Sequence, residues 1–136
     1  MSNPTKATCN AVDNRDNDSC VKCGFSLHVA PGSRHHRKLR SQGGKHDVEN
    51  LILLCGSGTT GCHGWVHANP KQAYAGGFIV KSSKLPVSVP VFYHDGWHHL
   101  EGVVRVPVNA NTAVEYMVLL GAITTGKGWR TDDEKR

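Results

Sequence analysis

The sequence lacks any apolar run long enough to cross a bilayer. Its longest uncharged apolar stretch, residues 116–123, falls far short of the roughly 20 residues that a transmembrane helix needs. The amino-terminal residues Met-Ser-Asn-Pro-Thr-Lys also lack the apolar segment of a signal peptide. These absences exclude a membrane protein and argue against a secreted one, so we expect the protein to be cytoplasmic.

Apolar side chains are scarce throughout. Hydrophobic residues make up 38% and aromatic residues 7% of the 136 residues, enough for one domain with a thin core. Small domains with thin cores often depend on a bound metal or on disulfides. Because the thiols of a cytoplasmic protein stay reduced, the five cysteines favour metal ligation over disulfides.

Four of the cysteines fall into two pairs. Cys20 and Cys23 are separated by two residues and followed by glycine, which is typical of a zinc knuckle. Cys55 and Cys62 are further apart than the usual spacing of about two to four residues, but a Gly/Ser/Thr loop between them could close the site. We predict a structural zinc bound by these four thiolates; the alternatives are a redox pair or unrelated buried cysteines. Cys9 remains as a free thiol, a packing residue, or a ligand that displaces one of the four.

Histidine is abundant, with nine residues, and two groups stand out. His63 and His67 are four residues apart in a segment that suits a short helix with Thr60 as its cap, so both would lie on one helical face near a shared ion. His35 and His36 are adjacent in an expected strand, where neighbouring side chains point to opposite faces. One imidazole of this pair can therefore face an ion and the other a water molecule. The alternative is ordinary surface or helix histidines.

A basic cluster surrounds the paired histidines. No acidic residue occurs between positions 34 and 46. The positive side chains of this segment are Arg34, Arg37, Lys38, Arg40 and Lys45. Such a local excess of positive charge suits nucleic-acid phosphate and would position a backbone without reading its sequence. The alternative is a solvated basic loop. His28 and His46 are expected at the surface or near bound DNA.

Short elements are expected around these motifs. They are a strand at residues 33–36, a polar loop at 37–50, a buried strand at 51–54, and the helix that carries His63 and His67. A second helix would begin at Asn69 and Pro70, with asparagine as its cap, and end at Gly76 and Gly77.

The rest of the chain predicts mainly β structure. Residues 77–81 indicate a strand, and the turn signal Asp95-Gly96 predicts a hairpin of residues 87–93 and 97–106 whose first arm is an edge strand because of Pro90. Residues 109–120 could form a helix or a strand. We expect no catalytic role for His94, His98 or His99. The predicted organisation is a flexible segment at 1–18, a metal-bound core at 19–80, a β-rich extension at 81–123 and a disordered tail at 124–136.

Three motifs resemble the HNH endonuclease family. They are His35-His36-Arg37, residues 50–55 (Asn-Leu-Ile-Leu-Leu-Cys) and residues 62–67 (Cys-His-Gly-Trp-Val-His). Over residues 19–80 the sequence is most similar to the small HNH proteins that bacteriophages encode near their terminase genes. The resemblance implies an α+β fold with a small ββα-metal core and a zinc cage, to which the hairpin-containing extension is added. The sequence departs from many members by having His rather than Asp at position 35, and by its long spacer between Cys55 and Cys62.

The resemblance assigns a role to each matching residue. His35, His63 and His67 correspond to the ligands of one catalytic divalent ion, and His36 corresponds to the general base. Asn50 corresponds to the residue whose side chain ties down the long loop, a plain turn residue being the alternative. The four paired cysteines correspond to the zinc cage of zinc-containing members.

The implied function is a metal-dependent endonuclease or nickase that acts on double-stranded DNA. A phage terminase large subunit is implied as a further partner in DNA packaging, and the host cytoplasm as the location. A neutral imidazole with a pKa of about 6.5 suits a base at cellular pH. Three imidazoles favour zinc, nickel or manganese, and phosphate oxygens in the remaining positions keep magnesium open. The alternatives are a non-catalytic zinc-stabilised DNA-binding module and a terminase adaptor that binds through residues 81–123.

Overall fold

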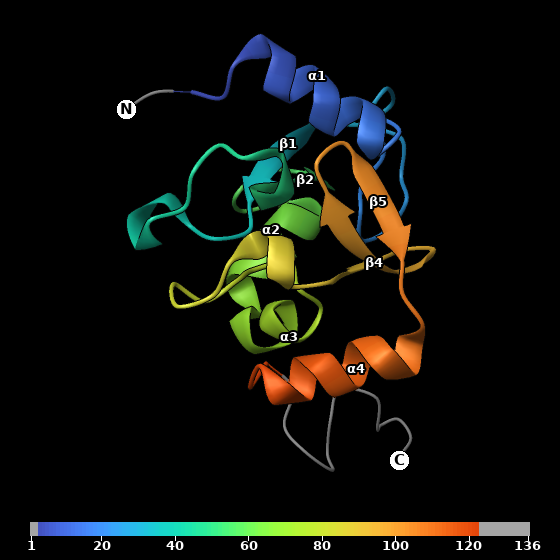
Figure 1. Ribbon diagram of the computed structural model, residues 1–136. Coiled ribbons are helices and arrows are strands. Elements are labelled where there is room, and N and C mark those ends of the chain that lie inside the picture. The colour runs from blue at the N-terminus through green and yellow to red at the C-terminus, as the bar shows by residue number, and fades with distance from the viewer. Residues whose placement is uncertain (1–2, 123–136) are drawn as a thin grey trace.

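Two small antiparallel sheets organise the chain in the computed structural model, which describes residues 3–122 (Figure 1). The first sheet pairs β1 (Gly32–His36) with β2 (Leu51–Cys55). The second sheet has the order β3-β4-β5 and consists of β3 (Val91–Tyr93), β4 (Gly96–Glu101) and β5 (Val104–Pro107). The predicted mixture of helices and strands is thus confirmed.

Helices flank both sheets. They are α1 (Lys6–Arg15), α2 (Gly61–Ala68), α3 (Pro70–Ala75) and α4 (Ala110–Leu119). Three single turns of 3-10 helix, η1 (Arg40–Gln42), η2 (Val48–Asn50) and η3 (Pro86–Ser88), lie in the connections. In Figure 1, α1 and α4 lie at opposite ends of the molecule, with α2 between them. No helix within residues 3–122 is long and apolar enough to span a bilayer.

Strand β2 is apolar along its length because both of its faces are covered. Leu51 and Leu53 pack with Val12 of α1 in one cluster. Ile52 and Leu54 point the other way, into the main cluster. A half-buried strand would alternate polar and apolar residues, whereas a strand buried on both faces needs none. The buried strand expected at residues 51–54 therefore sits at the centre of the fold, next to the strand that carries His35 and His36.

Residues 6–15 form a packed helix, so the flexible segment predicted at residues 1–18 is wrong for this part of the chain. Arg15 and Asp16 are buried and paired at 2.9 Å. Arg15 also donates to the carbonyls of Val48 and Leu51 at 2.8 and 2.5 Å, and the Tyr93 hydroxyl donates to Asp16 at 2.5 Å. Polar residues that the sequence suggested were solvated instead tie α1 to β2 and β3, because each buried polar group has found a partner.

Several predicted elements differ from the structure. Residues 77–81 form no strand; their backbone runs irregularly beside β1, where the Val80 amide donates to the Arg37 carbonyl at 2.8 Å. The predicted arm at 97–106 is split into β4 and β5 by a turn at Gly102, whose φ of +63° suits glycine. Within residues 109–120, for which the sequence allows a helix or a strand, residues 110–119 form the helix α4.

Two predicted helix caps do not form. Thr60 precedes α2 and Asn69 precedes α3, but neither side chain caps its helix. The Thr60 hydroxyl accepts from the Ser57 amide at 2.9 Å, and the Asn69 amide donates back to the Trp65 carbonyl at 3.0 Å. Thr60 therefore hydrogen-bonds within the loop before α2, and Asn69 hydrogen-bonds back to α2.

The main hydrophobic cluster extends across the boundary predicted at residue 80. It contains Cys20 and Ile52 from the predicted core together with Val91, Tyr93 and Leu100 from the predicted extension. The second sheet thus shares its core with the first. The disordered tail predicted at 124–136 lies outside the described residues.

Candidate active site

Three imidazoles from two elements meet at the junction of the first sheet and α2. His35 comes from β1, and His63 and His67 come from successive turns of α2. One nitrogen from each ring lies within 4.8 Å of one from each of the others. The ring centroids of His35 are 4.9 Å from His63 and 5.5 Å from His67, and those of His63 and His67 are 4.9 Å apart. Imidazole is a common ligand for transition-metal ions, so this donor set fits a single divalent cation.

Hydrogen bonds orient two of these rings. Nε2 of His35 lies 2.9 Å from the carbonyl oxygen of Phe78. A carbonyl accepts only, so Nε2 carries the proton and Nδ1 is left with its lone pair. Nδ1 of His63 lies 2.6 Å from the Ser33 hydroxyl. Metal-ligating histidines usually have their second nitrogen hydrogen-bonded in this way, which fixes the ring and its tautomer.

Burial keeps two of the ligand histidines, His35 and His63, neutral. Burial, followed by the neighbouring charge of His63, lowers the pKa of His35 to about 3. Burial and His67 also lower the pKa of His63. A metal ion binds the neutral form of imidazole, so these side chains do not have to lose a proton near neutral pH. The electrostatics of the cluster therefore favour a ligand set.

A fourth imidazole stands beside the cluster. His36, at the end of β1, is half-buried, and its Nε2 lies 3.0 Å from Nδ1 of His46. Burial, His46 and Arg40 lower the pKa of His36, in that order of importance, so it too is neutral near pH 7. All four histidines line one open cavity of about 340 Å³. Its lining residues are Arg34, His35, His36, Leu39, Arg40, Ser41, His63 and His67.

Asn50 closes the loop between β1 and β2. Its Oδ1 accepts from the Lys38 amide at 2.7 Å, and its Nδ2 donates to the carbonyls of Lys38 and Lys45 at 3.1 and 2.8 Å. The side chain is buried, so these bonds are shielded from water. Asn50 therefore joins both ends of the basic loop.

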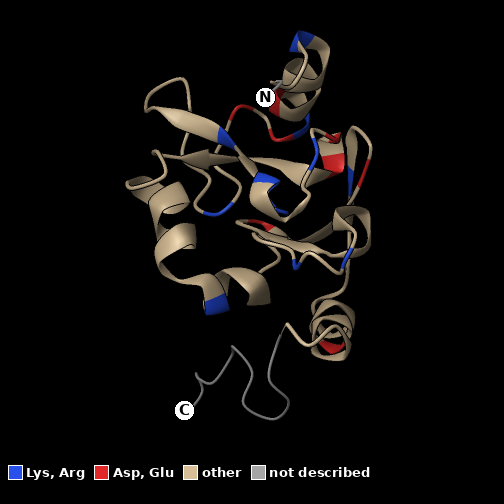
Figure 2. Ribbon diagram, turned by 90° about the vertical axis from the view of Figure 1, so that its left-hand side faces the viewer, with Lys and Arg blue, Asp and Glu red and all other residues tan. Residues whose placement is uncertain are grey.

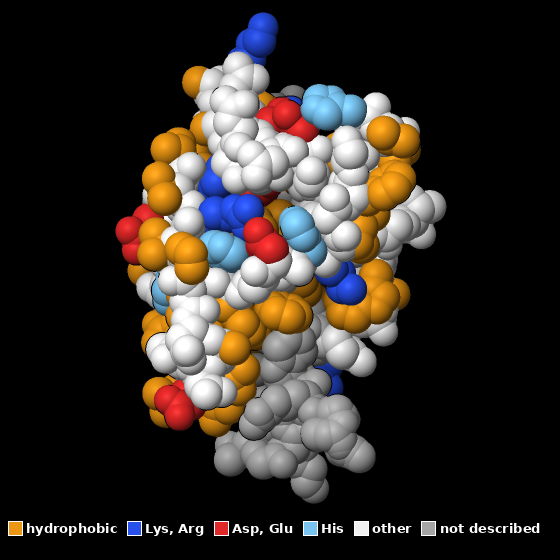
Figure 3. Space-filling model, turned by 90° about the vertical axis from the view of Figure 1, so that its right-hand side faces the viewer, with side chains coloured by type: hydrophobic (Ala, Val, Ile, Leu, Met, Phe, Trp, Pro, Cys, Tyr) orange, Lys and Arg blue, Asp and Glu red, His pale blue; other side chains and the backbone are white. Residues whose placement is uncertain are grey.

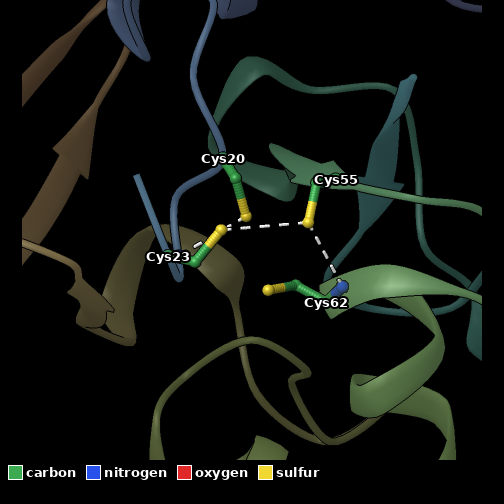
Figure 4. Close-up of side chains that lie close together, drawn as sticks. All are labelled: Cys20, Cys23, Cys55 and Cys62. Carbon is green, nitrogen blue, oxygen red and sulfur yellow. Dashed lines mark hydrogen bonds between the residues drawn. The ribbon is translucent and has the colours of Figure 1, made fainter. Parts of the chain in front are cut away.

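The four paired cysteines form a second cluster, and Figure 4 shows their sulfur atoms turned toward a common centre. All four sulfurs lie within 4.8 Å of one another, and Sγ of Cys23 and Cys55 are 3.9 Å apart. Tetrahedral zinc with Zn–S bonds of about 2.3 Å implies sulfurs about 3.8 Å apart. Burial, with Cys20 nearby, raises the pKa of the Cys62 thiol, so a cation is needed to hold the thiolates together.

Backbone amides also face these sulfurs. The amides of Cys23 and Cys62 donate to Sγ of Cys20 and Cys55 at 3.5 and 3.4 Å. The long spacer between Cys55 and Cys62 therefore does not separate the second pair. Cys9 lies on α1 and belongs to neither metal-ligand group found in the described part of the chain.

Arg37 is not a DNA-binding residue, so this prediction is wrong. Its side chain is fully buried. The guanidinium donates to four backbone carbonyls, those of Gly77, Glu49, Pro86 and Val89, at 2.6–3.0 Å. Burial lowers its pKa to about 9, which still leaves it charged near neutral pH. Arg37 thus fastens the irregular segment 77–89 to the β1–β2 unit.

The other predicted DNA contacts differ in their exposure. Arg34 pairs with Asp13 at 2.7 Å, and the Lys38 ammonium donates to the Lys84 carbonyl at 3.1 Å. Arg40 lines the open cavity and Lys45 is exposed. Figure 2 looks onto the β1–β2 connection and shows basic positions along it. The opposite face, drawn in Figure 3, has basic, acidic and histidine side chains next to one another, so it is the less suitable side for phosphate.

Ser33 and His46 are functional candidates that sequence reasoning missed. Ser33 could have been found, because it lies two residues before His35 on a strand and so points to the same face. His46 could not, since only the closure of the loop brings it to His36.

In comparisons with known proteins, one family model matches the segment that contains this site. Residues 20–68 match the model of the HNH endonuclease family. No curated protein and no solved structure gives a significant match to the chain. The matched segment includes both metal-ligand clusters, His36 and Asn50, and leaves the β3–β5 sheet outside it. Over the segment that carries its candidate site, the chain is therefore similar to the HNH endonucleases.

Proposed function

We propose that the protein is a metal-dependent endonuclease or nickase that hydrolyses phosphodiester bonds of double-stranded DNA. One observation carries the proposal. Three imidazoles each place a ring nitrogen within 4.8 Å of one in each of the others, and a fourth imidazole, hydrogen-bonded to His46, lines the same open cavity. Hydrolysis of a phosphodiester needs this combination of a cation site and a separate base.

Each side chain has a distinct role in this proposal. His35, His63 and His67 would hold a divalent ion, which would supply Lewis-acid polarisation of the phosphate and stabilisation of the leaving oxygen. His36 takes a proton from the attacking water, since its ring is neutral near pH 7 and hydrogen-bonded to His46. Asn50 keeps the loop that follows His36 in place through its three hydrogen bonds.

The DNA backbone would lie over the cavity. Arg40, which lines the cavity, and Lys45, which is exposed on the loop, are the candidates for phosphate contacts. Arg34 can contribute after exchanging its partner Asp13 for phosphate. Lys38 is half-buried and would reach phosphate only after its ammonium leaves the Lys84 carbonyl. These contacts would position DNA without reading sequence.

The cysteine cluster supplies structure to the same unit. A zinc ion bound by Cys20, Cys23, Cys55 and Cys62 would join the segment before β1 to the end of β2 and the start of α2. Zinc binding to such sites is coupled to folding, so the ion would fix the helix that carries His63 and His67. Partnership with a phage terminase rests on the sequence resemblance alone and stays a prediction.

The test is cleavage of supercoiled plasmid by the purified protein with manganese, magnesium, nickel or zinc. We expect nicking by the wild-type protein and a loss of about 100-fold or more in His36→Ala. Circular dichroism and manganese affinity should be unchanged in the variant, because His36 is not among the proposed ligands. His28→Ala, an exposed position outside the cavity, serves as the matched histidine control. Equal, background-level cleavage by wild type and His36→Ala would contradict the proposal and favour a non-catalytic DNA-binding module.

A further inference from the structure

His36 and His46 are joined by a hydrogen bond between their rings. Nε2 of His36 lies 3.0 Å from Nδ1 of His46, and the ring planes are inclined by 57° with centroids 5.2 Å apart. The inclination and the distance exclude a stacked pair and agree with an edge-to-edge N–H···N contact. His46 is ten residues away along the chain, so the contact depends on the fold of the intervening loop.

The loop is held so that it brings His46 to this position. Asn50 donates to the carbonyl of Lys45, the residue before His46. One residue earlier, the Gly44 amide donates to the Leu39 carbonyl at 2.9 Å. A Cβ atom at Gly44 would lie 1.7 Å from the Lys38 carbonyl oxygen, so only glycine allows the loop to close this tightly. After His46, the Asp47 carbonyl accepts from the Asn50 amide at 2.9 Å, so the loop is held on both sides of His46.

Two arrangements of the shared proton are possible, and they have opposite consequences. If His46 donates from Nδ1, Nε2 of His36 accepts and a neutral His36 carries its own proton on Nδ1. Such a ring has no free lone pair and cannot take a proton from water. If His36 donates from Nε2 to Nδ1 of His46, Nδ1 of His36 keeps its lone pair and can act as a base. Only the second arrangement is compatible with a base at His36.

We propose that His46 is a positioning residue that accepts the Nε2 proton of His36 and so holds the general base in its active tautomer. The catalytic part of this inference rests on the proposed function, whereas the tautomer can be tested without it. His46 acts through His36 and contacts neither metal nor substrate. Its role extends that of Asn50, which secures the loop on which His46 stands.

The kinetic test uses two substitutions of similar shape. His46→Asn keeps an acceptor near the position of Nδ1, and His46→Leu removes it. We expect kcat for plasmid nicking to fall about 10-fold in His46→Leu with KM unchanged, and to recover most of this loss in His46→Asn. On the His36→Ala background, His46→Leu should have no further effect. His28→Leu, a change at an exposed histidine, should nick like wild type.

A second measurement does not depend on cleavage. Long-range ¹H–¹⁵N NMR of the histidine rings at pH 7.5 should show His36 protonated at Nε2 and unprotonated at Nδ1 in the wild type. In His46→Leu this single tautomer should give way to a mixture. A His36 ring protonated at Nδ1 in the wild type would overturn the proposal, as would equal kinetic losses in His46→Asn and His46→Leu. If no DNA is cleaved but the Nε2 tautomer is present, the proposed function fails and the pairing of the two rings stands.

Discussion

The hydroxyl of Ser33 lies 2.6 Å from Nδ1 of His63, joining the start of β1 to the first turn of α2. Ser33 and His35 are two residues apart on one strand and therefore point to the same side. The strand that supplies one proposed metal ligand thus also orients a second. This links the geometry of the cavity directly to the packing of α2 on the first sheet.

Replacing Ser33 by alanine should weaken binding of the divalent ion. Without the hydroxyl, the His63 ring can rotate and exchange tautomers, and loss of such an outer hydrogen bond typically costs about 10–100-fold in metal affinity. Isothermal titration with manganese measures the effect. Ser82→Ala, at an exposed position outside the cavity, is the control. Equal affinities for the two variants would show that Ser33 does not orient a ligand.

The stability of the protein without added divalent ion should fall as the pH drops below neutrality. The pKa of His35 is about 3 in the fold, against about 6.5 in an unfolded chain. Between these values the unfolded state takes up a proton that the folded state does not, so the stability present above pH 6.5 is lost as the pH falls toward 3. The free energy of unfolding should fall by at most about 1.4 kcal/mol per pH unit because of this one group.

The variant His35→Asn separates this contribution from that of other groups. Between pH 7 and pH 5, urea unfolding of the wild type should lose about 2 kcal/mol more than that of the variant. Identical pH dependence in both proteins would mean that His35 titrates normally in the fold.

Arg37→Ala should destabilise the fold by roughly 3 kcal/mol, because it leaves buried carbonyl oxygens without a donor. Urea unfolding measures this change. Lys45→Ala is the contrasting variant: Lys45 is exposed, so its stability should change by less than about 0.5 kcal/mol, while its DNA affinity should become less dependent on salt. If Arg37→Ala were as stable as wild type and bound DNA more weakly, the assignment of Arg37 to the core would be wrong.

Cys23→Ser should release the structural zinc and lower the melting temperature, since ligation is coupled to folding. Metal content by mass spectrometry and thermal unfolding check the two effects together. Cys9→Ser provides the matched change outside the cluster and should retain both the zinc and the melting temperature of the wild type. Full zinc content in Cys23→Ser would count against the four-cysteine site.

Local patterns in the sequence predicted much of the site. The spacing of His63 and His67 depends only on the helical repeat, and the apolar run at residues 51–54 depends only on burial. Both features are set within a few residues, so they could be inferred without the fold. The cysteine pairs were visible for the same reason, and their cluster in the structure fits zinc.

Long-range partners account for the errors. Arg37 sits in a basic segment and looks like a phosphate contact, but its acceptors are carbonyls of residues 49, 77, 86 and 89. Asp16 lies in a polar stretch, yet it is buried against Arg15 and Tyr93. The partner of a buried polar group can come from any part of the chain, so local composition cannot reveal it.

The most direct test of the account is a crystal of the protein soaked in manganese and measured at an energy where manganese scatters anomalously. The account predicts one anomalous peak in the open cavity, at coordination distance from one ring nitrogen each of His35, His63 and His67, with His36 unligated. Absence of a peak there at saturating manganese, or a peak bound by His36 and His46 instead, would contradict it.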